Sequence, residues 1–290
     1  MNTVLYYIAL PLIYGISYLP FWWMYRLSDF LIFILYSLVG YRRKVVRQNL
    51  SNAFPTKNQS EIEQIERGFY RFFGDLILET IKGLTISSRQ LKKRVVFENV
   101  EVFEKYFEDK QSVIIAMGHF GNWELGGARC AIEPIHQLNV IYRPLKDKNF
   151  NRLVSRARSR FGSGLYPMKE TMRRMIQDKD QVTATAFIAD QTPSRKNAFW
   201  MEFLHQDTPV FMGTGKIANK MGYPVVYASV NQTKRGYYHI RLTDLVPNPT
   251  EVSPEEIVTR FTRKLEEDIN QNPSTWLWSH RRWKHKREHT

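Results

Sequence analysis

The sequence predicts an α/β fold in which helices cover both faces of a mainly parallel central sheet, preceded by an N-terminal membrane-anchoring helix. Short apolar runs rich in β-branched residues alternate with helical patterns, and repeated strand, loop and helix units favour a right-handed, parallel winding. A hydrophobic share of 43% over 290 residues is enough for one large core. The stretch from Met1 to Tyr25 carries no charged side chain, which is typical of a membrane segment.

Residues 1–40 form the predicted membrane anchor. As a helix, Met1 to Tyr25 would be about 37 Å long at about 1.5 Å per residue, against roughly 30 Å for the hydrocarbon core of a bilayer. Two prolines and a glycine interrupt this stretch, and a second apolar run from Phe30 to Val39 follows it. The anchor is therefore either one tilted span or a kinked, half-immersed helix.

Aromatic and basic residues favour a membrane anchor over the alternative, a buried helical hairpin of a soluble domain. The segment holds aromatic rings of the kind that settle at the level of lipid headgroups, namely Tyr6, Tyr7, Tyr14, Tyr18, Phe21, Trp22, Trp23 and Tyr25. Basic residues follow the apolar stretch at Arg42, Arg43, Lys44 and Arg47. Positive charge here predicts that residues 41–290 form one domain on the cytoplasmic side.

Hydrophobic spacing predicts the elements of this domain in order. A long amphipathic helix is expected from Glu61 to Leu84 and a shorter helix from Asn99 to Glu108. The alternating strands are expected at Val113–Met117, Leu138–Tyr142, Val182–Ala189 and Pro224–Val230, and the helices at Leu125–Ile132, Lys148–Phe161, Gly215–Met221 and Pro254–Asn270. Tyr237–Leu242 is expected to add an antiparallel strand at the edge of the sheet.

Charge and cysteine content limit the classes of partner and chemistry. The formal charge of +14, from 42 basic and 28 acidic residues, implies an acidic partner such as nucleic acid, an anionic membrane surface or an acidic protein. Cys130 is the only cysteine, so no intrachain disulfide forms. Its position in an apolar helix predicts a buried thiol rather than a nucleophile.

The stretch Ser112–Gly127 joins a buried strand to a turn that carries reactive side chains. Its apolar run is typical of a strand covered on both faces, and Gly118 and Gly121 then allow a tight loop. His119 and Glu124 lie on that loop. Because open α/β sheets place their sites at the carboxyl ends of interior strands, this loop is the expected place of the chemistry.

His119 is the predicted general base, because an ordinary imidazole pKa near 6.5 lets it accept and return a proton at neutral pH. Glu124, five residues further on, is expected to orient the ring and stabilise the imidazolium. This spacing does not place both on one face of a helix, so the pair requires a turn at Gly121 and Asn122. A purely structural histidine is the alternative.

Other catalytic chemistries find little support in the sequence. There is no Gly-x-Ser-x-Gly elbow, and Gly213–Ile217 lacks the glycine spacing of a phosphate-binding loop. No second histidine follows His119 at helical spacing and Cys130 has no partner, so no metal site is predicted. A base with its carboxylate remains, which suits activation of a substrate hydroxyl without a covalent enzyme intermediate.

The segment His119–Glu124 resembles the His-x4-acid signature of the glycerolipid acyltransferase superfamily. Its wording, Gly-His-Phe-Gly-Asn-Trp-Glu, resembles specifically the late, or secondary, lipid A biosynthesis acyltransferases of Gram-negative bacteria. Further segments recur in the order of that family over essentially the whole chain, including Tyr142-Arg143-Pro144, Ala189-Asp190-Gln191, Gly215–Val226 and the basic, tryptophan-rich tail Trp276–Lys284. His205 departs from the pattern, where relatives often have glycine, which puts the shape of the local loop in doubt.

The resemblance implies transfer of a fatty acyl chain to a hydroxyl of a lipid A precursor at the cytoplasmic face of the bacterial inner membrane. The implied donor is an acyl carrier protein thioester, with acyl-CoA as an alternative, and no cofactor is implied. By this likeness His119 deprotonates the acceptor hydroxyl, and Glu124 supports His119. The reaction then needs donors for the developing oxyanion.

Residues near the same strand ends receive further roles from the resemblance. Arg143 is expected to hold the oxyanion charge or a lipid phosphate, with a surface salt bridge as the alternative. Asp190 is expected to line the same mouth, either by pairing with Arg143 or by holding a loop, without transferring a proton. Asn122 and Trp123 are expected to shape the turn.

Two groups of basic residues then have candidate partners. Arg152, Arg156 and Arg160 recur at four-residue intervals and form a stripe that would meet an acidic carrier protein, with a solvated face as the alternative. The tail Arg281–Arg287, next to three tryptophans, suits an anionic membrane interface or lipid phosphates.

Two other functions remain open at this point. Within the enzyme class, the acceptor could be another glycolipid, an aminolipid or a lysophospholipid. From a different class, a peripheral membrane protein or a nucleic-acid binding protein would use the same basic and aromatic residues, with a structural His119. The uncharged N-terminus argues against nucleic acid as a partner.

Overall fold

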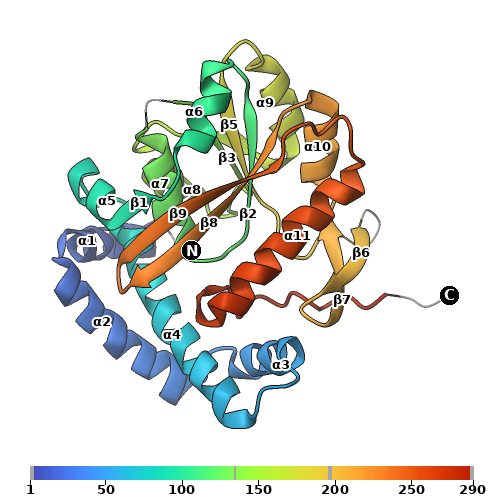
Figure 1. Cartoon of the computed structure of the whole chain (residues 1–290). Coiled ribbons are helices and arrows are strands. Elements are labelled where there is room, and N and C mark those ends of the chain that lie inside the picture. The colour runs from blue at the N-terminus through green and yellow to red at the C-terminus, as the bar shows by residue number, and fades with distance from the viewer. Residues whose placement is uncertain (1–2, 134, 195–197, 288–290) are drawn as a thin grey trace.

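The computed structural model describes residues 3–133, 135–194 and 198–287. They form an α/β fold around a seven-stranded sheet with helices on both of its faces (Figure 1). The strands run across the sheet in the order β1-β9-β8-β2-β5-β3-β4, and β6 and β7 form a separate hairpin. The predicted fold class is confirmed.

The bounds of the elements follow the chain from its N-terminus. The strands are β1 (Val95–Phe97), β2 (Val113–Met117), β3 (Gln137–Tyr142), β4 (Gly164–Pro167), β5 (Thr183–Ile188), β6 (Ala198–Phe203), β7 (Gln206–Phe211), β8 (Val225–Lys234) and β9 (Tyr237–Val246). The helices are α1 (Thr3–Tyr18), α2 (Phe21–Phe33), α3 (Arg43–Ala53), α4 (Gln59–Lys82), α5 (Ser88–Arg94), α6 (Glu101–Glu108), α7 (Trp123–Ala131), α8 (Lys148–Ser159), α9 (Thr171–Gln177), α10 (Gly213–Met221) and α11 (Pro254–Gln271). Short helical turns are η1 (Ile34–Val39), η2 (Met168–Glu170) and η4 (Pro273–Thr275).

Strand β2 occupies the middle of a parallel block. It pairs in parallel with β5 on one side and with β8 on the other, and β3 and β4 continue the block beyond β5. Its side chains alternate between two hydrophobic cores, with Ile114 and Ala116 in one and Val113 and Ile115 in the other. Helices therefore cover β2 on both faces, as its unbroken apolar run predicts.

Strand β9 is antiparallel to β8, as predicted, but it is not the edge of the sheet. The three-residue strand β1 pairs in parallel with β9 and covers it. A strand of three residues gives no periodic signal in the sequence, which is why β1 was not expected.

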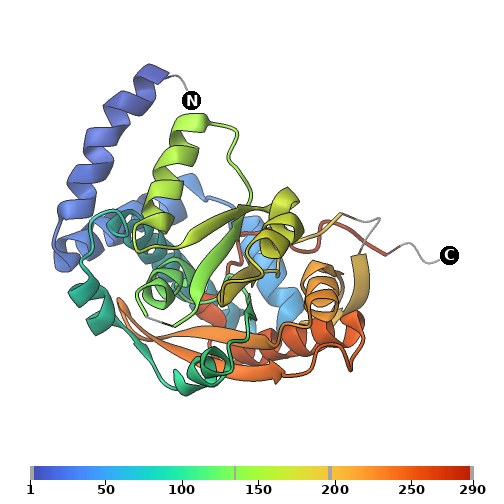
Figure 2. The same cartoon turned by 90° about the horizontal axis from the view of Figure 1, so that it is seen from above.

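The N-terminal arm, residues 3–39, consists of α1, α2 and η1. α2 lies beside α4, and α1 extends past α8 (Figures 1 and 2). Within the described residues, the continuous helical segment Phe21–Val39 is the one helix long and apolar enough to cross a membrane.

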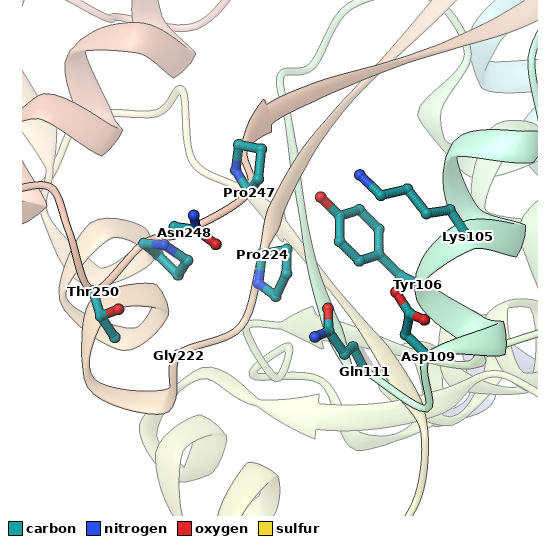
Figure 3. A pocket seen from close by; sticks show the side chains of 10 residues that line it. Lys105, Tyr106, Asp109, Gln111, Gly222, Pro224, Pro247, Asn248 and Thr250 are labelled. Atoms are coloured by element: carbon teal, nitrogen blue, oxygen red, sulfur yellow. The ribbon is translucent and has the colours of Figure 1, made fainter.

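A small pocket of about 240 Å³ lies at the amino ends of β2 and β8 (Figure 3). Gln111 lines it just before β2, and Pro224 lines it just before β8. Parallel sheets gather reactive groups at the opposite, carboxyl ends of their strands. This pocket is therefore separate from the loop that carries His119.

Candidate active site

Two glycines bring the loop after β2 into close contact with the rest of the domain. A Cβ on Gly118 would lie 2.7 Å from Cδ1 of Leu265. Gly121 has a φ of +60°, and a Cβ there would lie 1.6 Å from the carbonyl oxygen of Val230. A side chain at Gly121 is therefore excluded by both backbone conformation and space, and the predicted turn depends on this glycine.

His119 is held by Asp190, which follows β5. Nδ1 of His119 lies 2.6 Å from Oδ1 of Asp190, and the backbone N–H of His119 donates to Oδ2 at 2.8 Å. An ionised carboxylate only accepts hydrogen bonds, so Nδ1 carries the proton and Nε2 keeps its lone pair. The imidazole is thereby fixed in the tautomer that a general base requires.

Asp190 remains ionised because of its hydrogen-bond donors. Burial by itself raises the pKa of Asp190, but the electrostatic effect of the adjacent His119 side chain and hydrogen bonds from His119 and Trp276 lower this pKa to about 2. The indole N–H of Trp276 donates to Oδ2 at 2.8 Å. The backbone N–H of His119 and the indole of Trp276 both donate to Oδ2, so Oδ1 remains available to the imidazole.

The other side of the imidazole faces the mouth of the site. Nε2 of His119 lies 3.3 Å from the side-chain nitrogen of Gln191, and the ring of Trp123 meets the imidazole edge-on at 4.8 Å between centroids. The His119 side chain is 17% exposed. A hydroxyl that displaces the Gln191 amide can therefore reach Nε2.

The prediction that Glu124 contacts the imidazole is wrong. Both carboxylate oxygens of Glu124 accept from Arg158 of α8, at 2.5 Å from Nη2 and 3.0 Å from Nε. α7 begins at Trp123, directly after the turn, so Glu124 lies in the first turn of that helix and faces α8. Asp190, expected to pair with Arg143 or to hold a loop, takes the position on the ring instead.

Asn122 shapes the turn by capping α7. Its Oδ1 accepts from the backbone N–H of Leu125 at 2.9 Å, and its Nδ2 donates to Oε2 of Glu79 at 2.6 Å. Glu79 is fully buried on α4 and also accepts from the hydroxyls of Tyr25 and Tyr238, at 2.7 and 2.6 Å. Burial raises the pKa of Glu79, and these three donors oppose that effect.

Sequence reasoning missed Glu79 because an acid within an amphipathic helix is typical of a solvent-facing position. Glu79 is buried on the same helix as Leu76 and Leu78, but the sequence pattern alone does not show that an acid at this position is buried with them. Its hydrogen bond with Asn122 gives it a part in the support of the His119 loop.

Arg143, predicted at the site, and the three arginines of the predicted docking stripe have different surroundings. Arg143 lies just after β3 and makes no hydrogen bond or ion pair with the residues that the structure describes. Arg152 and Arg156 lie on α8, at its surface. Arg160 lies beyond the end of α8 and donates to the carbonyls of Gly83 and Ile86, so it does not continue their stripe.

The start of the C-terminal tail forms a wall of the site, while Arg281, Lys284, Lys286 and Arg287 of its basic part are exposed, so their predicted contact with an anionic surface stays a prediction. The backbone N–H of Gly121 donates to the carbonyl of Thr275 at 2.9 Å, and that of Leu277 donates to the carbonyl of His119 at 3.1 Å. Trp276 and Trp278 are 2% and 0% exposed. The alternation of these tryptophans reflects burial of an extended segment, not contact with lipid.

Arg282 is a buried cation in the same tail. It is 2% exposed, and its Nε and Nη1 have no partner in the part of the chain that is described. Its carbonyl accepts from Thr192, two residues after Asp190, at 2.7 Å. Burial lowers the pKa of Arg282 to about 10, and the nearby charge of Asp190 opposes this. Burial likewise lowers the pKa of His280 to about 4.

The described residues contain no group of three His, Cys, Asp or Glu side chains that could hold a metal ion. Cys130 is a free cysteine whose pKa burial raises to about 12. A thiol with such a pKa is a poor nucleophile at neutral pH. The arrangement therefore offers acid–base chemistry centred on His119.

Known proteins resemble this chain over most of its length. A model of the bacterial lipid A biosynthesis acyltransferase family matches residues 1–285. A lipid A biosynthesis acyltransferase of Haemophilus influenzae is 25% identical over 252 residues, covering 85% of this chain and 79% of that protein. A lipid A biosynthesis palmitoleoyltransferase of Escherichia coli strain K12 is 21% identical over 246 residues, covering 84% and 79%. The chain, an acyltransferase, therefore belongs to the bacterial lipid A biosynthesis acyltransferase family.

Proposed function

We propose that this enzyme moves a fatty acyl chain from an acyl carrier protein thioester to a hydroxyl of a lipid A precursor. The observation that carries the proposal is the 2.6 Å contact between Nδ1 of His119 and Asp190, at the carboxyl ends of two adjacent parallel strands. Family membership supports the reaction class, and the names of the relatives support lipid A as the acceptor.

In the proposed reaction, Nε2 of His119 removes the proton from the acceptor hydroxyl while its oxygen attacks the thioester carbonyl. A carbon–oxygen bond forms and the carbonyl oxygen becomes an oxyanion. When the oxyanion collapses, the carbon–sulfur bond breaks, and the departing thiolate takes the proton from the imidazolium. Asp190 stabilises the imidazolium throughout without accepting its proton.

Donors for the oxyanion come from the mouth of the site. The Gln191 amide lies next to Nε2 and is free to turn once a hydroxyl has displaced it. Arg143, exposed and unpaired among the described residues, is the residue that we propose holds the oxyanion or a phosphate of the acceptor. Glu124 fixes the Arg158 guanidinium beside α7, and this pair positions the acceptor rather than moving a proton.

The acidic carrier protein would meet surface arginines. Arg152 and Arg156 belong to α8, and such charges accelerate encounter with a partner of opposite charge. Acyl-CoA is the alternative donor. The enzyme would work at the cytoplasmic face of the inner membrane, where its N-terminal arm contacts lipid.

The proposal is tested with washed membranes that contain the full-length protein, an acylated carrier protein and a lipid A precursor. Thiol release and the mass of the acceptor lipid report transfer, and acyl-CoA replaces the carrier protein in a parallel reaction. We expect His119→Ala to abolish both signals. The matched control is His239→Ala, an exposed histidine on β9 that pairs with Glu98. Full activity of His119→Ala would refute the mechanism, and acylation of a different lipid class would correct the acceptor.

A further inference from the structure

The N-terminal arm is fastened to the catalytic domain along its length. At the corner between α1 and α2, Nζ of Lys82 donates to the carbonyls of Ser17 and Leu19, both at 2.8 Å. Further along, in α2, the Tyr25 hydroxyl donates to buried Glu79 at 2.7 Å. These contacts join the corner and the first half of α2 to α4.

The second half of α2 is held in the same way. Arg235, in the turn between β8 and β9, lies 2.6 Å from Asp29 of α2 and 2.7 Å from Asp75 of α4. The ring of Tyr36 in η1 lies 4.9 Å from the ring of Tyr70 in α4. Segment Phe21–Val39 therefore follows α4 over most of its length.

A transmembrane position of Phe21–Val39 would break these contacts. Glu79 is 0% exposed, and removing Tyr25 from it would leave this buried acid short of a hydrogen-bond donor, which is costly. Asp29 would also lose its partner Arg235 on entering the hydrocarbon. Spanning would also carry Arg26 and Asp29 into hydrocarbon. At about 1.5 Å per residue the segment reaches only about 28 Å, slightly less than the hydrocarbon core.

The outer face of the arm has the composition of a lipid-facing surface. Large apolar side chains are exposed along α1, α2 and η1, at Tyr7, Ile8, Leu12, Tyr18, Trp22, Trp23, Phe30, Phe33, Leu38 and Val39. An apolar patch of this kind marks a binding surface. Arg26 is exposed at helical spacing from Trp22 and Phe30, where it would reach anionic headgroups.

We propose that α1 and α2 lie in the plane of the membrane, with this outer face in the headgroup and upper acyl layer, and that the chain does not cross the bilayer. The partner is an anionic phospholipid surface, which the aromatic face and the net charge of +14 favour. The proposal rests on the membrane association proposed above. It also links lipid contact to the His119 loop, through Tyr25, Glu79 and Asn122.

Topology in sealed membranes tests the proposal on the full chain. One protease-cleavable tag is added ahead of Met1 and a second after Thr290, and cleavage is compared in spheroplasts and in inverted inner-membrane vesicles. We expect both tags to be protected in spheroplasts and both to be cut in inverted vesicles. Opposite protection of the two tags would show a crossing and overturn the proposal. Recovery of the chain in the soluble fraction would also overturn it, while acyl transfer measured in that fraction would leave the proposed reaction standing.

Binding of the purified protein to vesicles of anionic phospholipid tests the surface itself. The triple variant Trp22→Ser, Trp23→Ser, Phe30→Ser should lower the partition coefficient about tenfold or more. The matched control, Phe107→Ser with Ile176→Ser, removes exposed apolar side chains of α6 and α9, outside the arm, and should bind as the unchanged protein does. Equal binding by the triple variant, with unchanged circular dichroism, would overturn the assignment of the outer face.

Discussion

Asp190 and Glu124, the two carboxylates considered as partners of the imidazole, differ in what surrounds them. The Asp190 side chain is 4% exposed and accepts hydrogen bonds from the His119 ring, the His119 backbone and Trp276. The Glu124 side chain is 18% exposed and is bound by Arg158. Asp190 is 71 residues from His119 in the sequence, whereas Glu124 is five residues away.

Strand pairing, not sequence spacing, supplies the partner of His119. Met117 at the end of β2 pairs with Ile188 at the end of β5, so the residues that follow each strand meet. Glu124 is nearer along the chain, but α7 has already begun and turns its side chain toward α8. In the proposed mechanism, acid–base support therefore comes from Asp190, and Glu124 acts through Arg158.

Replacing Asp190 with asparagine should have the largest effect. The neutral amide would lack the charge that stabilises the imidazolium and could hold the imidazole in the wrong tautomer, so we expect kcat to fall about 10³- to 10⁴-fold, with KM changed little. Steady-state kinetics with the acylated carrier protein measure both constants. Asp244→Asn is the control, because Asp244 lies on β9 and hydrogen-bonds Tyr106, away from the His119 loop. A kcat within tenfold of the unchanged enzyme would remove Asp190 from the mechanism.

A third carboxylate, Glu79, supports the loop between β2 and α7 that carries His119. Glu79→Ala would leave the hydroxyls of Tyr25 and Tyr238 and the Asn122 amide without their acceptor, so the free energy of unfolding should fall by about 2–4 kcal/mol. Chemical unfolding in detergent measures this loss. Glu63→Ala, on a solvent-facing part of the same helix, should change it by less than about 1 kcal/mol. Equal losses in the two variants would contradict the supporting role of Glu79.

The sequence predicted the reactive turn because its causes are local. The observed bounds of β2, Val113–Met117, are those expected, since an unbroken β-branched run identifies a strand buried on both faces. The requirement for Gly121 also follows from local backbone geometry. The location of His119 at a strand end needed only these two signals.

The contacts that orient His119 were not predictable because they join distant segments. Trp276 reaches Asp190 across 86 residues, and Thr275 accepts from Gly121 after the chain has passed through α11. A tail of alternating tryptophans and arginines has the same composition whether it meets lipid or a core. The burial of Trp276 and Trp278 depends on where α11 ends and directs the chain that follows it.

The lowered pKa of Asp190 should make the free energy of unfolding depend on pH in the acid range. This pKa is about 2 in the folded protein, against an ordinary value of 3.8 that we take for the unfolded chain. The resulting stability, about 2 kcal/mol, is present above pH 4 and is lost as the pH falls from about 4 to 2. Unfolding measured at steps across this range should show a smaller loss in Asp190→Asn than in the unchanged protein. Equal slopes would contradict the assigned pKa.

The smallest loss of activity is expected for variants of Glu124 and Arg158, because neither residue contacts the imidazole. Because the pair is partly exposed, Glu124→Gln and Arg158→Gln should each lower kcat/KM roughly 10- to 30-fold, or about 1.4–2 kcal/mol. The double variant should lose little more than either single variant, since each removes the same contact. Arg129→Gln is the matched control, because Arg129 lies on α7 as Glu124 does and pairs with Glu133, just beyond the end of that helix. If Glu124→Gln alone matched the loss in Asp190→Asn while Arg158→Gln remained active, Glu124 would act directly on the reacting atoms and the division between the two carboxylates would fail.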